Sequence, residues 1–200
     1  MEYNKEKLND GIEKVNKLLE NNPLPTWDEL PGLELYMDQV VSILDKHLSC
    51  FANKDSKIIT STMINNYVKQ KIVKPPKNKK YDRVHLAYLI SVCTLKQIIC
   101  ISELCSGIEV ILNNNSIPDV YDTFCELLET ALKNVFSGKP PLSHSPADSF
   151  ELKIIKAVIT SFASLQYTRS LLETVANKDS LEEPSAPETK QTKTKTKKSE

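Results

Sequence analysis

One stretch of the chain, Thr60 to Tyr81, reads TSTMINNYVKQKIVKPPKNKKY and decides how the remainder is interpreted. Thr60 is suited to cap a helix, because a threonine hydroxyl accepts a hydrogen bond from a backbone N–H of the first turn. Apolar residues then recur at helical spacing and form one face: Met63, Ile64, Tyr67 and Val68. The other face is polar and contains no acidic residue: Ser61, Thr62, Asn65, Asn66 and Lys69. The pattern predicts a short amphipathic helix.

The second half of this stretch predicts a basic hairpin. Pro75 and Pro76 lack backbone donors and stop any helix. Four polar residues follow, Lys77 to Lys80, and Tyr81 closes the hairpin. We expect two short strands, with residues 72–73 paired against residues 80–81. A polar helix followed by a basic hairpin is typical of a winged helix-turn-helix, in which the helix enters the major groove and nearby cations meet phosphates.

Four residues of the stretch lie at the offsets of a known signature: Tyr67, Ile72, Val73 and Pro75. The spacing resembles that of MerR-type regulators, in which a Tyr ends the recognition helix and a Leu-Leu-x-Pro-like run opens the wing. Tyr81 resembles the Tyr on which that wing returns, and the resemblance covers roughly residues 40–112. Asn65 and Lys71 stand where the family usually has Arg and Gly, so its base-reading residues do not carry over to this chain.

Three motifs carry a second and closer resemblance: residues 24–27 (LPTW), residues 35–39 (LYMDQ) and residues 63–69 (MINNYVK). They are similar to a bacterial family named domain of unknown function number eighteen thirty-six. This resemblance spans most of the chain before the C-terminal tail. It implies a fold and no established biochemistry.

The charge of the chain is balanced overall and uneven locally. The 200 residues carry a formal net charge of zero, and this length suits one medium domain or a small domain with added helices. Between Lys54 and Arg83 there are nine cationic residues and only two acidic ones, Asp55 and Asp82. A basic patch on a neutral protein fits contact with a polyanion through one face. The alternative is a solvated lysine-rich loop.

Apolar spacing elsewhere predicts an all-α fold whose only strands are in the wing. Asp82 is the expected N-cap of an almost entirely apolar central helix, Ser102 is that of the next helix, and Trp27 is expected to anchor an extended arm. The predicted helices are residues 4–20, 33–48, 83–99, 102–112, 119–136 and 148–175. The predicted organisation is an N-terminal helix and arm (1–32), a MerR-like winged helix-turn-helix domain (33–113), a C-terminal helical hairpin (114–177) and a disordered tail (178–200).

The last predicted helix has two apolar faces. Ile159 and Phe162 lie on one face, while Val158, Leu165 and Leu172 lie on another. A helix that is apolar on two sides needs two covering surfaces. We therefore expect a homodimer joined through residues 148–176, and the MerR resemblance implies the same arrangement.

The sequence shows none of the common enzyme or cofactor motifs. Its four glycines never cluster, which excludes a P-loop or dinucleotide fingerprint, and there is no His-Glu-x-x-His pair. Cys93, Cys100 and Cys105 could in principle bind a soft metal or sense oxidants, but the Cys-x-x-Cys spacing of such sites is missing, and buried free cysteines are common. We expect no enzymatic activity, no metal and no cofactor.

The expected location is the cytoplasm. The first residues lack an apolar run behind a basic leader, so no signal peptide is predicted. No apolar stretch reaches the roughly twenty residues that a membrane helix needs. Five cysteines without regular spacing fit reduced thiols.

The sequence therefore predicts a DNA-binding transcriptional regulator of MerR-like type, whose partner is double-stranded DNA. Asn65 and Asn66 are expected to read bases, because asparagine pairs bidentately with adenine, while Tyr67 and the lysines hold phosphates. The predicted contact residues are Ser61, Thr62, Asn65, Asn66, Tyr67, Lys69, Lys71, Lys74, Lys77, Lys79 and Lys80. The alternative is a non-enzymatic helical module that uses the same face to bind a protein.

Overall fold

The computed structural model describes residues 23–52 and 57–179, and this part of the chain is helical. No regular strand occurs in it, which confirms the predicted all-α class for these residues. The predicted helix over residues 4–20 lies outside the described residues, as does the predicted tail beyond residue 179. The elements are α2 (Met37–Leu48), the short 3-10 helix η1 (Ser49–Phe51), α3 (Ser61–Lys69), α4 (Arg83–Leu95), α5 (Ile101–Leu112), α6 (Ile117–Phe136) and α7 (Phe150–Asp179).

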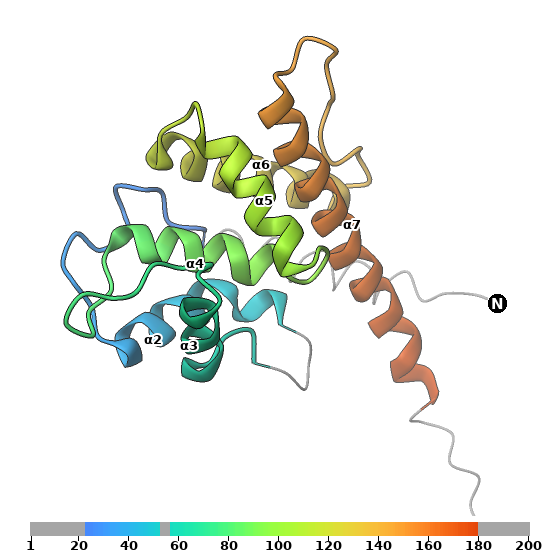
Figure 1. Cartoon of the computed structure of the whole chain (residues 1–200). Helices are drawn as coiled ribbons and strands as arrows, with labels where there is room; N and C mark the ends of the chain where they lie inside the picture. The colour runs from blue at the N-terminus through green and yellow to red at the C-terminus, as the bar shows by residue number, and fades with distance from the viewer. Residues whose placement is uncertain (1–22, 53–56, 180–200) are drawn as a thin grey trace, which may run out of the picture.

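Helix α4 lies at the centre of the molecule (Figure 1). Helices α2 and α3 lie on one side of it, and α5, α6 and α7 lie on the other. Nine of its thirteen residues are buried, as expected of a helix that is apolar almost all round. The predicted N-cap is confirmed, since Asp82 Oδ1 accepts a hydrogen bond from the His85 backbone N–H at 3.1 Å.

Several helix boundaries differ from the predicted ones, including those of α4, α5 and α6. Helix α4 ends at Leu95 instead of Ile99, and α5 is capped by Cys100, whose backbone N–H donates to Glu103 Oε2 at 3.0 Å. Helix α6 begins at Ile117, so Pro118 lies inside its first turn instead of before it. Proline is tolerated there because the N–H that it lacks would have no intrahelical acceptor.

The predicted two-stranded wing is wrong in its pairing. The backbone N–H groups of Ile72 and Val73 both donate to the Tyr67 carbonyl, at 3.0 and 3.4 Å, so they close the end of α3 and are not available to a hairpin. Tyr81 pairs instead with Leu35, through two N–H to carbonyl hydrogen bonds of 2.8 Å. This pairing keeps residues near Leu35 extended and makes α2 start at Met37, later than predicted.

The segment before α2, residues 23–36, which we call the arm, lies against α6, and Trp27 was predicted to anchor it to the body of the protein. The Trp27 backbone N–H donates to Asp122 Oδ1 at 2.6 Å, and its ring meets the Tyr121 ring edge-on, with centroids 6.4 Å apart. The Tyr121 hydroxyl donates to the Pro25 carbonyl at 2.9 Å. The Arg83 guanidinium lies over the Trp27 ring at 5.6 Å, which ties the arm to the start of α4. The anchoring role is confirmed.

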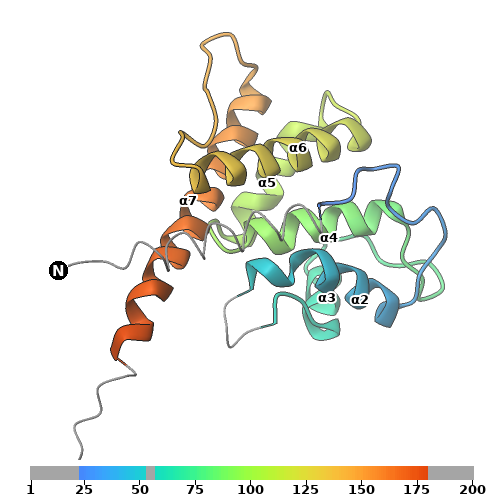
Figure 2. The same ribbon diagram turned by 180° about the vertical axis from the view of Figure 1, so that it is seen from behind.

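Helices α6 and α7 pack against each other, and α7 continues past them. Ile159, Phe162 and Ala163 are completely buried, whereas Leu172 is 62% exposed. The C-terminal half of α7 projects beyond the other labelled helices in both views (Figure 2).

The turn at residues 77–80 has an unusual backbone. Lys80 N–H donates to the Lys77 carbonyl at 2.9 Å, and the two residues between them, Asn78 and Lys79, have φ values of 51° and 61°. Two central residues with positive φ form a type I′ turn, which favours Asn followed by Gly. Lys79 therefore occupies a position where its Cβ is strained.

We expect Lys79→Gly to raise the free energy of unfolding by roughly 0.5–1 kcal/mol, because relief of left-handed strain outweighs the greater freedom of glycine in the unfolded chain. Lys77→Gly is the matched control, since Lys77 has no positive φ, and it should lower the same quantity. Urea denaturation followed by circular dichroism measures both. Equal losses in the two variants would contradict the turn geometry.

Candidate nucleic-acid interface

Helix α3 separates polar and apolar side chains cleanly. Its predicted cap is present, since Thr60 Oγ1 accepts a hydrogen bond from the Met63 N–H at 3.2 Å, while Ile64 and Tyr67 are buried. Successive helical residues rotate by about 100°, which confines the five exposed polar residues to an arc of about 140°. These residues are Ser61, Thr62, Asn65, Asn66 and Lys69, which we call the α3 face. The helix therefore presents one continuous, non-acidic polar surface.

The two asparagines of the α3 face are exposed and uncommitted. Within the described part of the chain, no group forms a hydrogen bond with the side-chain amide of Asn65 or Asn66. Each amide offers a donor and an acceptor side by side. Both can therefore pair with a partner without first breaking a contact within the protein.

Tyr67 lies apart from the α3 face. It is only 6% exposed, and burial raises the pKa of its phenol. The Lys96 ammonium lies over its ring at 5.7 Å. This position gives Tyr67 a packing role on the buried side of α3, in contrast to the predicted phosphate contact.

The predicted lysines fall into two groups. No acidic residue occurs between Lys57 and Tyr81. Lys80 is half-buried, with its Nζ 3.9 Å from Glu34 Oε2 and 5.6 Å from the centroid of the Tyr36 ring, so it is already engaged. The others are exposed: Lys69, Lys71, Lys74, Lys77 and Lys79.

A buried histidine holds the segment between α3 and the turn. His85 is 8% exposed, its Nε2 lies 3.1 Å from the Lys74 carbonyl oxygen, and its Nδ1 lies 2.6 Å from Asp82 Oδ1. Burial alone would raise the pKa of Asp82, but its hydrogen bonds with His85 outweigh that effect and lower it. This anchor was not predicted from the sequence. The signal for it is the Asp-x-x-His spacing, in which the third helical residue reaches back to the cap.

A partly buried lysine holds the segment that leads into α3. Lys96 Nζ donates to the Ile58 carbonyl at 2.8 Å, and burial lowers the pKa of its ammonium. Ile58 lies two residues before the cap Thr60, so this contact helps to set where α3 starts. The sequence offered only a weak signal for it, a lysine at the end of an apolar helix.

The candidate interface lies within a region that matches a known protein family. The family described as Domain of unknown function (DUF1836) matches residues 25–124. The chain belongs to this family. The matched DUF1836 region includes the arm, the α3 face, the turn and both anchors, His85 and Lys96. No curated protein and no solved structure matches the chain significantly.

The structure places Cys93, Cys100 and Cys105 of the DUF1836 region in different surroundings. Cys93 is buried, and burial raises its pKa to about 11, while Cys100 is exposed and Cys105 is half-buried. Nowhere in residues 23–52 and 57–179 do three or more His, Cys, Asp or Glu side chains come together as metal ligands would. None of the described helices has both the length and the apolar character needed to span a membrane.

We expect Lys96→Met to lower the free energy of unfolding by about 1–3 kcal/mol, because it leaves the Ile58 carbonyl without its charged donor. Lys133→Met is the control, since the exposed Lys133 side chain pairs with Glu129 at 3.5 Å, and it should change stability by less than about 0.5 kcal/mol. Urea denaturation measures both variants. A loss at Lys96 no larger than that at Lys133 would contradict the anchoring role.

Proposed function

We propose that this protein is a DNA-binding transcriptional regulator whose α2, α3 and following turn act as a winged helix-turn-helix of MerR-like type. The observation that carries the proposal is the α3 face. It consists of five exposed polar side chains without an acid, on a helix whose opposite side is fixed in the core. A helix of this kind can enter the major groove, where sequence is read at base edges.

The surroundings of α3 support phosphate contact. Five exposed lysines follow or end the helix, and phosphate contacts fix the register of a protein on a duplex without reading sequence. In this proposal Lys80 is left out, because Glu34 already lies beside it. Lys71 has a φ of 60°, the left-handed conformation that suits glycine, at the position where MerR-type proteins usually carry Gly. That local geometry supports the resemblance.

A second candidate is a non-enzymatic helical module that binds another protein. It is favoured by two exposed apolar side chains beside the turn, Leu33 at 65% and Tyr36 at 55% exposure. It is also compatible with a formal net charge of zero. Both candidates use the same region, so they differ in the partner and not in the site.

Substitutions of the base-reading residues and of the phosphate-binding residues should have different effects on DNA binding. We expect Asn65→Ala or Asn66→Ala to relax preference at one base position by roughly 1–3 kcal/mol with little change in salt dependence. Lys79→Ala should weaken binding to all duplexes alike and reduce the salt slope by about one unit. Lys133→Ala, an exposed lysine on α6, is the control and should change neither.

The measurement is selection of bound fragments from random DNA, followed by gel retardation over a range of salt concentrations. If the purified protein retards no duplex even at low salt, the DNA-binding proposal is wrong. The protein-binding module then becomes the better account of the α3 face.

We further propose that the protein is a homodimer joined through α7. Support comes from the projecting half of this helix and from the exposed Leu172. A two-fold dimer would present two copies of α3 to a palindromic site. Light scattering at tens of micromolar should give twice the chain mass, and Leu172→Glu should lower it, whereas Thr130→Glu, at an exposed position on α6, should not. A wild-type monomer would exclude the dimer.

A further inference from the structure

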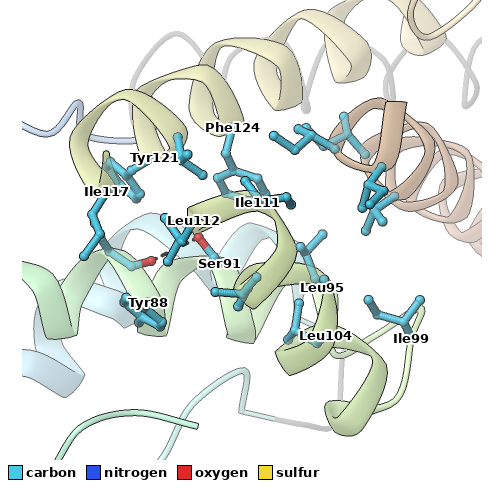
Figure 3. A pocket seen from close by; sticks show the side chains of 18 of the residues that line it. Tyr88, Ser91, Leu95, Ile99, Leu104, Ile111, Leu112, Ile117, Tyr121 and Phe124 are labelled. Atoms are coloured by element: carbon cyan, nitrogen blue, oxygen red, sulfur yellow. Dashed lines mark hydrogen bonds between the residues drawn. The ribbon is translucent and has the colours of Figure 1, made fainter. Parts of the chain in front are cut away.

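A cavity of about 340 Å³ lies between α4, α5, α6 and α7 (Figure 3). Its lining is almost entirely hydrocarbon, and side chains from α4, α5 and α6 converge on it, such as Leu95, Leu104, Ile111 and Phe124. It is partly open to solvent. Its volume lies within the range of small-molecule sites, which are typically concave and mostly apolar.

We propose that this cavity binds an uncharged, mainly hydrocarbon molecule of roughly ten to fourteen carbon atoms. The size follows from volume, because an apolar cavity of about 150 Å³ admits benzene and this one is a little more than twice as large. A molecule of this kind supplies van der Waals contacts that the lining side chains otherwise lack.

The polarity of the ligand follows from the charged and polar lining groups. Among the described residues that line the cavity, Glu103 is the only ionic one, and none is Lys, Arg or His. Hydrogen bonds from the Cys100 side chain and backbone N–H lower the pKa of Glu103, so it is an anion at neutral pH. An anionic ligand would meet repulsion and no counter-charge. The Ser91 hydroxyl donates to the Ala87 carbonyl at 3.0 Å and retains lone pairs that can accept one hydrogen bond from a neutral alcohol.

Gly107 keeps the cavity open. It lies in the interior of α5, where glycine is less stable than alanine by up to about 1 kcal/mol, and it lines the cavity. A Cβ added at this position would meet no atom within 4 Å. Packing therefore gives no reason for the missing side chain, whereas a ligand that uses the space does.

The cavity is connected to the parts that hold the candidate interface. Tyr121 lines it, and the same side chain donates through its hydroxyl to Pro25 in the arm that reaches Tyr81. Leu95 lines it one residue before Lys96, which holds the segment leading into α3. A ligand that changes these contacts can bias the position of α3. This regulatory role rests on the proposed function, whereas binding of the ligand to the cavity does not depend on it.

The test uses the full chain in the absence of DNA. The probe is phenylnaphthylamine, a neutral molecule whose fluorescence rises in apolar surroundings. We expect one probe per chain, displaced by decanol and not by decanoate. Gly107→Leu fills the cavity and should weaken binding at least about tenfold. Ser106→Leu, the same side chain at the exposed neighbouring position, should leave binding unchanged.

Val158→Phe fills the cavity from α7 and serves as a second variant if Gly107→Leu does not fold by circular dichroism. Three results would overturn the proposal: no probe binding by the wild type, unchanged binding in a folded cavity-filling variant, or equal displacement by decanoate. None of these measurements involves DNA, so a failure of the DNA-binding proposal would not affect the proposal that the cavity binds a ligand. Gel retardation with and without decanol then measures the regulatory role.

Discussion

The burial of most of α4 is the constraint on which the other elements depend. A helix that is apolar almost all round is stable in water only if neighbours cover its whole surface. Helices α2 and α3 cover one side, and α5, α6 and α7 cover the other. The polar groups at its two ends are used to hold loops, through His85 at the start and Lys96 just after the end. The same helix therefore forms the core and fixes the segments on both sides of α3.

Local features of the sequence predicted local structure well. The caps Thr60 and Asp82, the amphipathic α3 and the buried α4 all follow from side-chain types within one or two turns. The predicted wing failed because its register depended on a partner far away in sequence. Tyr81 pairs with Leu35, and nothing near residues 72–81 reports that Leu35 is available.

The residue types of the candidate site could be predicted from the sequence, but their three-dimensional arrangement could not. The exposed polar residues and lysines could be selected from their spacing, but the burial of Tyr67 and the engagement of Lys80 by Glu34 depend on tertiary contacts. The cavity had no sequence signal, because apolar residues that line a space have the same spacing as residues that fill one. Gly107 alone differed, and a single glycine in a helix has many explanations.

The arm has a consequence for how the chain folds. Its hydrogen bonds join Leu24 to Glu129 and Pro25 to Tyr121, pairs that are 105 and 96 residues apart in sequence. Closing so long a loop costs more chain entropy than forming contacts between successive helices. The contacts of the arm can offset this cost only after α6 has formed. We therefore expect docking of the arm to be a late event in folding and its release to be an early one in unfolding. Because the arm also pairs with Tyr81, we expect the turn beside α3 to reach its final position only after residues from both ends of the matched region have met.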